Sequence, residues 1–367
     1  MKVLVVSGLW PPDVGGPASH APEVAAFLAA RGHEVEVVVT AGSAPAREAY
    51  PVHWISRELP PGIRHADAVR VIVEHAHQAD VVYTTGMFGR SSLGALVART
   101  PFVVKLTADP AYERARRWGL WDGSLEEFQH AATLTTLPLR LARDADVRRA
   151  AHVVTPSSYL RELAVGWGVP VNGVTVLPNP APLLDGIRPR AAVRRELGFE
   201  APTLVFAGRL TAQKQLDVGI EAARRAGVAL AIAGDGPDRS ELERLGHARF
   251  LGARSRREVL ELFRAGDASL LSSAWENFPH TVVEALAVGT PVIATRTGGV
   301  VEAVRDGENG LLVEPGDVEA LAAAIRRFFD EPGLAERLRA AAAPSVESYS
   351  AEHVYGRLEQ ILISAAR

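Results

Sequence analysis

Short apolar segments rich in β-branched residues alternate along the chain with longer segments whose apolar positions recur at helical spacing. The strand-like runs are VLVVS, VEVVVT, DVVYTT, FVVKL and HVVTP in the first half, and TLVFAG, LAIAG, RFLG, SLLSS and PVIAT in the second. The helical segments HAPEVAAFLAARG and LDVGIEAARRAG end at a glycine, as helices often do. This alternation predicts parallel sheets of βα units, and the continuous apolar runs predict strands covered on both faces.

The rhythm is interrupted at VTVLPNPAPLLDGIRPR, a loose segment with three prolines after Leu177. A chain of 367 residues also exceeds the usual size of one hydrophobic core. We therefore predict two doubly wound, Rossmann-like α/β domains that face a central cleft. The expected domains are residues 1–182 and 183–345, with a C-terminal helix within 346–367 that packs back on the first domain. Such sheets bind ligands beyond the carboxyl ends of their strands.

The composition of the chain excludes several classes of function. Apolar residues make up 47% of the chain and charged residues 23%, as in folded globular proteins. A formal charge of -3 gives no general attraction for polyanions, so we expect no nucleic-acid partner. The absence of cysteine excludes disulfides, thiolate metal sites and a cysteine nucleophile. We expect a cytoplasmic protein, with the inner face of the membrane as the alternative location.

Apolar stretches give no reason to expect a membrane-embedded protein. The opening MKVLVVSGLWPP is too short in its apolar part for a signal peptide, and we interpret it as a buried strand. No run reaches the roughly 18 apolar residues that a membrane span needs. Peripheral contact with a membrane is not favoured either.

Two cations directly follow the first strand of the second domain. GRLTAQK comes after TLVFAG, which places Arg209 and Lys214 at the carboxyl end of that strand. A guanidinium that grips two oxygens in a plane and a mobile ammonium together suit a diphosphate. Solvated surface cations are the alternative, but the position after a strand and the acidic pair described next favour the diphosphate.

That acidic pair lies in SSAWENFPHTVVEALAVGTPVIA, where Glu276 and Glu284 stand on either side of a predicted helix start. The first carboxylate can accept hydrogen bonds from sugar hydroxyls and the second from a ribose, while free N–H groups at the helix start suit an anion. A continuous helix would hold the two about 12 Å apart, too far for a glycosidase. Pro279 argues against a continuous helix, so the spacing alone does not settle that alternative.

Glycines at two strand ends are weaker signals. Gly15 and Gly16 stand between the first strand and the next helix, where a backbone can approach a phosphate or a sugar closely. Neither this segment nor AGDGPDRS, with Gly234 and Gly236, completes a dinucleotide fingerprint, because Arg239 takes the third glycine's place in the latter. A nicotinamide-dependent oxidoreductase is thereby disfavoured.

Asp109 follows the strand FVVKL and is expected at the predicted cleft. Its carboxylate can accept a hydrogen bond from a sugar or assist a proton transfer. It can equally cap a helix that begins at Pro110, and the two roles can coexist.

We predict no metal site. Asp144 and Asp146 have a spacing that some transferases use for a metal, but their arginine-rich helical setting favours an ordinary surface. His75 and His77 are two apart on a predicted helix and therefore point to different faces.

The assembled segments resemble the family 4 retaining glycosyltransferases of GT-B architecture. The resemblance is specific in GRLTAQK, AGDGPDRSELERL, RFLGARSRREVLELF, SSAWENFPHTVVEALAVGTPVIATRTGGVVEAV and DGENGLLVEPGD, which occur in the family's order. It is looser in PPDVGGPASHA and AHVVTPSSYL. The chain departs from the family at Asp109, where many relatives have histidine, and at Asn277, where glycine is common.

The resemblance implies roles for individual residues. Arg209 and Lys214 would hold the donor diphosphate, Glu276 the transferred sugar and Glu284 the ribose. With Asp109, Arg209, Lys214 and Glu276 as catalytic residues, the expected nucleotide-sugar contacts are Gly15, Gly16, Gly234, Ala253, Arg254, Asn277, Phe278, Pro279, His280, Thr281, Val282 and Glu284.

The expected reaction is a retaining, metal-independent transfer of a hexose from a UDP- or GDP-sugar to an acceptor hydroxyl, with no further cofactor. By family analogy, a diphosphate oxygen accepts the acceptor's proton on the same face of the sugar. The acceptor would be a small molecule, a glycan or a lipid-linked sugar. The alternatives are a nucleotide-sugar epimerase or a phosphorylase on the same fold, and a non-catalytic nucleotide-sugar binding protein.

Overall fold

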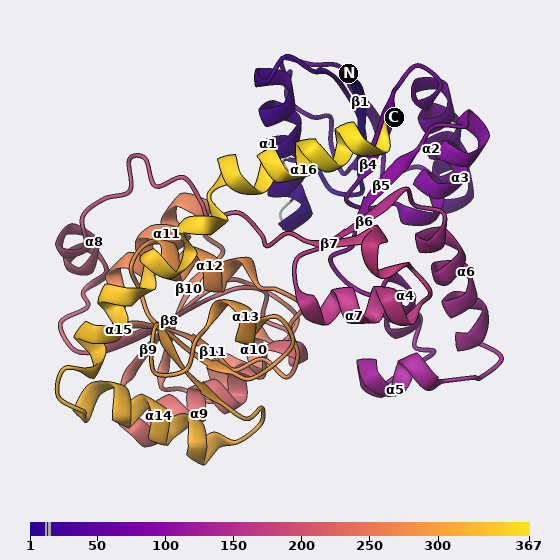
Figure 1. Ribbon diagram of the computed structural model, residues 1–367. Coiled ribbons are helices and arrows are strands. Elements are labelled where there is room, and N and C mark those ends of the chain that lie inside the picture. The colour runs from indigo at the N-terminus through magenta and orange to yellow at the C-terminus, as the bar shows by residue number, and fades with distance from the viewer. Residues whose placement is uncertain (12, 14–15) are drawn as a thin grey trace. The chain divides into compact units, whose positions relative to one another are not determined.

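The chain forms two compact units, each built on one parallel sheet. The computed structural model describes residues 1–11, 13 and 16–367 (Figure 1). The first unit consists of Met1–Leu177 together with Tyr355–Arg367, and the second of Pro178–Val354. The chain therefore leaves the first unit at Leu177, a few residues before the boundary expected at residue 182, and re-enters it at Tyr355.

The first unit holds a seven-stranded sheet in the order β3-β2-β1-β4-β5-β6-β7, with all neighbours parallel. Its strands are β1 Lys2–Ser7, β2 Glu34–Ala41, β3 Val52–Ser56, β4 Val81–Thr84, β5 Phe102–Lys105, β6 His152–Thr155 and β7 Val174–Val176. Its helices are α1 Gly16–Ala30, α2 Pro61–Ala76, α3 Phe88–Ala98, α4 Pro110–Arg117, α5 Leu125–His130, α6 Thr136–Arg148, α7 Ser158–Gly166, the 3-10 turn η1 Val171–Gly173, and α16 Ala351–Ala365, whose residues from Tyr355 on belong to this unit.

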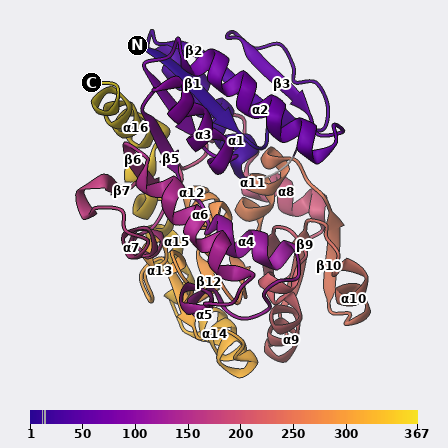
Figure 2. The same cartoon turned by 90° about the vertical axis from the view of Figure 1, so that its right-hand side faces the viewer.

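Helices cover both faces of this sheet. Leu4 and Val6 of β1 belong to the core formed with α2 and α3, while the alternating Val3 and Val5 point to the other face. Helix α1 lies against β1 and β2, and α2 packs beside α3 (Figure 2). Because both faces are covered, the β1 sequence KVLVVS is apolar without alternation.

Polar contacts attach α16 to α1 and to the turn that follows α1. The Tyr355 hydroxyl donates to Glu23 at 2.8 Å. The Glu359 carboxylate, on the next turn, contacts Arg31 at 3.1 Å and the His33 ring at 2.7 Å. The C-terminal helix thereby belongs to the first unit, on the sheet face that α1 covers.

The second unit holds a six-stranded parallel sheet in the order β10-β9-β8-β11-β12-β13. Its strands are β8 Thr203–Ala207, β9 Ala229–Ala233, β10 Ala248–Gly252, β11 Ala268–Leu271, β12 Val292–Thr295 and β13 Gly310–Val313. Its helical elements are α8 Arg190–Leu197, η2 Ala212–Lys214, α9 Leu216–Ala226, α10 Arg239–Arg244, α11 Arg256–Ala265, α12 His280–Ala287, α13 Val300–Ala303, α14 Val318–Asp330, α15 Leu334–Ala342 and η3 Pro344–Tyr349.

Both sheets reverse direction at one point. In each, the first strand of the unit pairs on one side with the second strand and on the other with the fourth, so the order reverses between β1 and β4 and between β8 and β11. Doubly wound sheets bind ligands at the carboxyl ends of strands beside such a switch point. GRLTAQK begins where β8 ends and SSAWENF where β11 ends, so both segments flank the switch point of the second unit.

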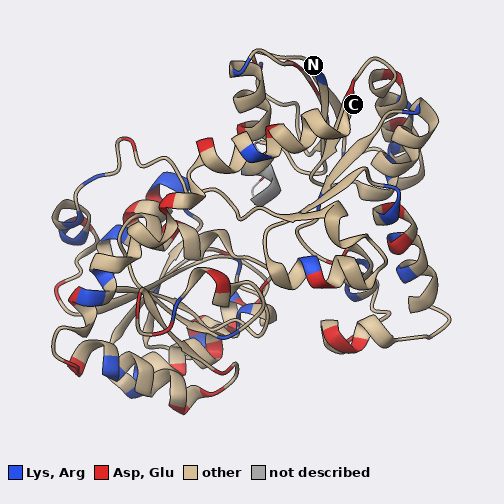
Figure 3. Ribbon diagram, in the orientation of Figure 1, with Lys and Arg blue, Asp and Glu red and all other residues tan. Residues whose placement is uncertain are grey.

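Two further properties bear on possible partners. Acidic and basic residues are interspersed along the helices of both units, without one extended stripe of a single sign (Figure 3). Among the described residues, no helix has the length and apolar character that crossing a bilayer requires.

Candidate active site at the carboxyl edge of the second sheet

Hydrogen bonds lock together the two loops that flank the switch point of the second unit. Ser272 Oγ donates to the carbonyl of Lys214 at 2.9 Å. The amide of Ala274 donates to the carbonyl of Gln213 at 2.8 Å, and the Gln213 side chain donates to the carbonyl of Trp275 at 2.9 Å. The loops after β8 and β11 therefore form one backbone platform.

This platform brings Lys214 and Glu276 into direct contact. The Lys214 ammonium donates to Oε1 of Glu276, and Ser273 Oγ donates to the same oxygen at 2.7 Å. Glu276 is only 6% exposed, so the ion pair offsets much of the cost of burying its charge. The carboxylate expected to bind a sugar thus holds the ammonium expected to bind a diphosphate.

Arg209 has a fixed backbone and an open side chain. The adjacent Leu210 is fully buried, and its amide donates to the carbonyl of Asp235 at 2.9 Å. The Arg209 side chain is exposed and makes no hydrogen bond or ion pair with any residue the structure describes. Its guanidinium donors are available to a ligand.

Gly234 allows the loop after β9 to lie against the loop after β8. Its φ is 142°, and a Cβ added there would lie 1.8 Å from the carbonyl oxygen of Gly208. At Gly236 an added Cβ would lie 2.2 Å from the carbonyl oxygen of Leu210. The predicted ligand contact of Gly234 stays a prediction, but its place beside the Arg209 loop has this steric reason.

The start of α12 adds backbone donors to the platform. The helix begins at His280 directly after Pro279, so Glu276 lies in the preceding loop and Glu284 within the helix. The backbone around the helix start is anchored by its carbonyls, since Asn277 O accepts from the amide of Gly299 and Phe278 O from the Asn179 side chain, both at 2.9 Å. Of the first-turn N–H groups, that of Val282 donates to the Pro279 carbonyl at 3.2 Å, while that of Thr281 has no acceptor within an α-helix and favours an anion.

Glu284 is buried beside a cation that the sequence analysis did not assign. It is 8% exposed, and Arg256 Nε lies 3.2 Å from its Oε1. Arg256 is the first residue of α11, two positions after Arg254. The RSRREV segment after β10 was the available signal, but nothing in its spacing pointed to Glu284.

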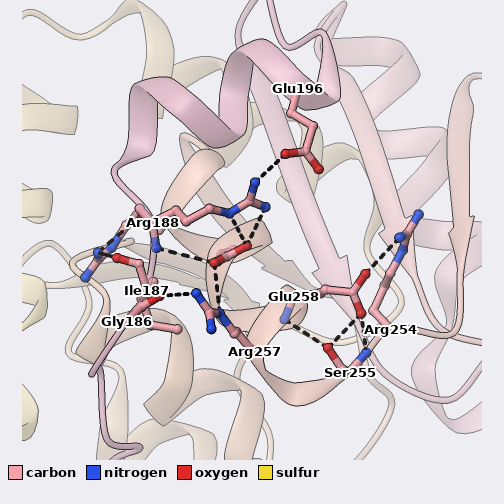
Figure 4. Close-up of polar contacts among 10 residues, drawn as sticks. Gly186, Ile187, Arg188, Glu196, Arg254, Ser255, Arg257 and Glu258 are labelled. Atoms are coloured by element: carbon pink, nitrogen blue, oxygen red, sulfur yellow. Dashed lines mark hydrogen bonds and ion pairs between the residues drawn. The ribbon is translucent and has the colours of Figure 1, made fainter.

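Ala253 and Arg254 both lie at the carboxyl end of β10 and are exposed. Arg254 Nη1 donates to Glu258 at 3.0 Å, and Ser255 forms a capping box with the same glutamate (Figure 4). Ala253 and Arg254 therefore lie in a strand-to-helix turn that these hydrogen bonds hold in place. Their contact with the nucleotide base stays a prediction.

Several buried polar atoms near these loops lack a hydrogen-bond partner among the described residues. Gln215 follows the β8 loop and has the left-handed φ of 42°, Asn277 follows β11, Thr297 follows β12, and Asn179 is bound to Phe278 through its other side-chain atom. The unpartnered atoms are Asn179 Oδ1, Gln215 Oε1, Asn277 Oδ1 and Thr297 Oγ1. Buried polar atoms of native proteins are rarely unpaired, so their gathering on one edge indicates a ligand site.

In the first unit, Asp109 caps α4. Its Oδ1 accepts from the amides of Ala111 and Tyr112, at 2.9 and 3.2 Å. Its Oδ2 accepts from Gln129 at 3.0 Å and from the buried Arg143 at 2.5 Å. The structure therefore shows the capping role, while a direct part in catalysis stays a prediction. Of the two glycines, Gly16 opens α1 and Gly15 lies outside the described residues.

A histidine cluster lies at the opposite, amino edge of the first sheet. Oxygen and nitrogen atoms of Glu36, His53 and His75 lie within 4.8 Å of one another, a grouping that could hold a metal. His75 Nδ1 is 2.7 Å from Glu36, and the Lys2 ammonium is 2.8 Å from the same carboxylate. The expectation of no metal site did not foresee this grouping, although Lys2 already supplies a cation there.

Both halves of the chain are similar in sequence to known proteins. A family model described as "Glycosyl transferases group 1" matches residues 190–344, and one described as "Glycosyl transferase 4-like domain" matches residues 15–180. A glycogen synthase of Mycobacterium tuberculosis is 30% identical over 412 residues, covering 100% of this chain and 95% of that protein. A D-inositol 3-phosphate glycosyltransferase of Streptomyces scabiei is 30% identical over 387 residues, covering 92% and 83%.

Solved structures show the same fold. Anabaena HepE in complex with UDP-glucose has a TM-score of 0.79 at 20% identity, covering 99% of this chain and 100% of that one. The sucrose-phosphate synthase of Thermosynechococcus elongatus has a TM-score of 0.78 at 20% identity, covering 99% of both. With the full-length match to the mycobacterial protein, these findings show that the chain belongs to the group 1, family 4 glycosyltransferases of GT-B fold and is a glycosyltransferase.

Proposed function

We propose that the protein transfers a hexose from a UDP- or GDP-sugar to an acceptor hydroxyl, with retention of the anomeric configuration and without a metal ion. The observation that carries the proposal is the platform at the switch point of the second sheet. There the Lys214–Glu276 pair, the open Arg209 and a set of unpartnered buried polar atoms lie on connected loops.

The donor diphosphate would bind between the cations and the start of α12. Arg209 offers a planar pair of donors, Lys214 a point charge, and the helix start its amide groups. In the transition state the departing diphosphate gains negative charge, and each preorganised donor aimed at it is worth about 3 kcal/mol. These groups supply the charge stabilisation that a divalent cation supplies in other transferases, which is the basis for proposing metal independence.

Glu276 suits the role of sugar acceptor rather than nucleophile. Its Oε1 is occupied by Lys214 and Ser273, while its Oε2 has no hydrogen bond to any described residue. Oε2 can therefore accept from a sugar hydroxyl while Oε1 orients the ammonium. Retention would then follow from attack on the face from which the diphosphate leaves, with a diphosphate oxygen taking the proton, as the family resemblance implies.

The names of the relatives support a nucleotide-sugar donor. HepE was solved with UDP-glucose, and the curated relatives include a glycogen synthase and D-inositol 3-phosphate glycosyltransferases. On this proposal Glu284 and Arg256 share the ribose end of the donor, because the buried Glu284 carboxylate of α12 is paired with the partly exposed Arg256 guanidinium.

The test compares Lys214→Ala with Arg244→Gln. Both residues lie in the second unit, but the Arg244 side chain donates only to a carbonyl of its own helix, α10. With UDP-glucose or GDP-glucose and a panel of sugar acceptors, Lys214→Ala should reduce turnover by about 100- to 1,000-fold. Arg244→Gln should leave it unchanged. A Lys214→Ala enzyme with the normal rate would contradict the assignment.

Product analysis separates the alternatives. A transferase forms a glycoside of retained configuration and releases the nucleoside diphosphate, and EDTA should not change the rate. A phosphorylase would need inorganic phosphate, an epimerase would isomerise the sugar without an acceptor, and a binding protein would bind the nucleotide without turnover.

A further inference from the structure

Three arginines lie at the carboxyl edge of the first sheet, far along the chain from the donor platform. Arg64 is in the first turn of α2, Arg90 in the first turn of α3, and Arg114 is in α4. These helices directly follow β3, β4 and β5, so each helix begins at the carboxyl edge of the sheet, where parallel sheets bind ligands. Helix α2 packs on α3, and α6 packs on both α3 and α4.

The charge of Arg90 is not balanced by any described residue. Its side chain is half-buried and makes no hydrogen bond or ion pair in the described part of the chain. Burial, followed by the charges of Arg64 and Arg114, lowers the pKa of Arg90 to about 10, which leaves the guanidinium charged at neutral pH. No carboxylate contributes to that shift. A half-buried cation repelled by two others is costly unless an anion joins it.

Neighbouring groups do not supply that anion. Arg64 Nη1 donates to the carbonyl of Arg57 at 2.8 Å, a neutral partner. Asp146 is the carboxylate that interacts with Arg114, and it lies 3.7 Å from Arg149. It therefore balances part of the Arg114 charge; although its Oδ2 lies beside Gly89, the residue before Arg90, it makes no ion pair with Arg90.

Arg70 shows the ordinary arrangement on the same helix. It lies on α2, is exposed, and pairs with both Asp67 and Glu74 at 2.9 and 3.1 Å. Arg70 and Arg90 therefore differ in their partners. The exposed Arg70 is paired with two carboxylates, whereas the half-buried Arg90 at the sheet edge is paired with none in the described part of the chain.

We propose that Arg64, Arg90 and Arg114 bind a phosphate group carried by the acceptor. The inference rests on the proposed function, in which the first unit binds the acceptor. Guanidinium groups match phosphate oxygens in pairs, and the starts of α2 and α3 add positive dipole ends at the same edge. The acceptor class is then a phosphorylated sugar or polyol, either free or attached to a lipid, and not an uncharged glycan chain.

The first experiment is calorimetry with inorganic phosphate on the full-length protein saturated with UDP, which occupies the donor site. The wild type should bind one phosphate. Arg90→Gln and Arg64→Gln should each weaken it at least 10-fold, with UDP affinity and thermal unfolding unchanged, and Arg70→Gln should bind as the wild type does. The proposal is overturned if the wild type binds no phosphate, if neither variant weakens it, or if Arg70→Gln weakens it equally.

The second experiment identifies the source of the phosphate. Transfer from the preferred donor is compared for glucose, glucose 6-phosphate, inositol and inositol 3-phosphate, and flotation is measured with vesicles containing phosphatidic acid. Preference for a soluble phosphorylated acceptor, lost in Arg90→Gln, indicates a free acceptor, while Arg90-dependent vesicle binding indicates a lipid-linked one. Equal rates with and without phosphate, together with no vesicle binding, overturn the proposal.

Failure of the proposed function would be recognised separately. If UDP and GDP do not bind, the donor assignment fails, and the phosphate titration is repeated without nucleotide on Lys214→Ala. If adding Arg90→Gln to Lys214→Ala abolishes phosphate binding, the arginine site is still established. If phosphate binding persists in the double variant, the arginine site is refuted.

Discussion

Lys105 is a buried lysine whose effect on stability can be measured. It is the last residue of β5 and is 2% exposed, and its side chain makes no hydrogen bond or ion pair with any described residue. Burial lowers the pKa of its ammonium from 10.5 to about 7. Replacing it with methionine keeps an unbranched side chain of similar length and removes the titrating group.

The magnitude follows from linkage between protonation and folding. Lowering the pKa from 10.5 to about 7 corresponds to a cost on the order of 5 kcal/mol for burying the protonated form. Between pH 7 and 10.5 the unfolded chain binds more protons at this lysine than the folded chain, so its contribution to stability improves as pH rises through that window. Lys105→Met should therefore be more stable than the wild type at pH 7, and that advantage should shrink by about 2 kcal/mol at pH 9.

Urea unfolding at both pH values measures this double difference. Tryptophan fluorescence is suitable because the first unit contains Trp10, Trp54, Trp118, Trp121 and Trp167, whereas the second contains only Trp275.

Lys2→Met is the matched control. The Lys2 ammonium pairs with Glu36 and Glu34, which raise its pKa above 10.5, so Lys2 stays protonated at pH 7 and 9 in both states. Its substitution should cost the same stability at both pH values. A Lys105→Met advantage that does not change between pH 7 and 9 would refute the reasoning, since it would mean that the buried amine does not titrate in this window.

Two further predictions concern a glycine of the second unit and a buried carboxylate of the first unit. Gly234→Ala should weaken UDP binding at least 10-fold by equilibrium titration, because the new Cβ meets Gly208 O, whereas Gly246→Ala, at positive φ with nothing within 4 Å, should leave UDP binding intact. Asp109→Asn should destabilise the first unit by about 1.5 to 3 kcal/mol in urea unfolding, because the buried Arg143 loses the charge of one of its two carboxylate partners and keeps Asp144, while UDP binding in the second unit stays the same.

The sequence predicts each central strand of the two sheets but only one of the four edge strands, β10, which the run RFLG covers. β3, β7 and β13 are all edge strands, and none was among the predicted runs. An edge strand has one neighbour and less apolar cover, so its sequence need not be a continuous β-branched run. VHWIS contains an exposed Trp54, VTV is three residues beside a proline-rich linker, and GLLV follows the polar turn DGEN.

Candidate site residues were accessible to sequence reasoning where a motif directly follows a strand. Arg209, Lys214 and Glu276 fall in that class, because a βα unit places the residues after its strand at the carboxyl edge. The partners of these residues were not accessible. Lys214 and Glu276 are 62 positions apart, and Arg256 and Glu284 are 28 apart, so only the order of strands in the folded sheet brings each pair together.

Two buried carboxylates show how the structure separates a structural role from a ligand-binding one. Asp109 and Glu276 both follow strands and both are paired with a cation. Asp109 has donors on both oxygens, whereas Glu276 has both of its donors on Oε1 and lies among loops that hold several unpartnered polar atoms. A satisfied carboxylate lowers the energy of the fold it belongs to, while buried polar atoms without a partner, such as Oδ1 of the adjacent Asn277, raise it until a ligand binds. Backbone contacts fix the loops of the second unit, so the energy needed to hold these polar atoms in place is spent during folding. The donors therefore need not reorganise when the sugar–phosphate bond breaks.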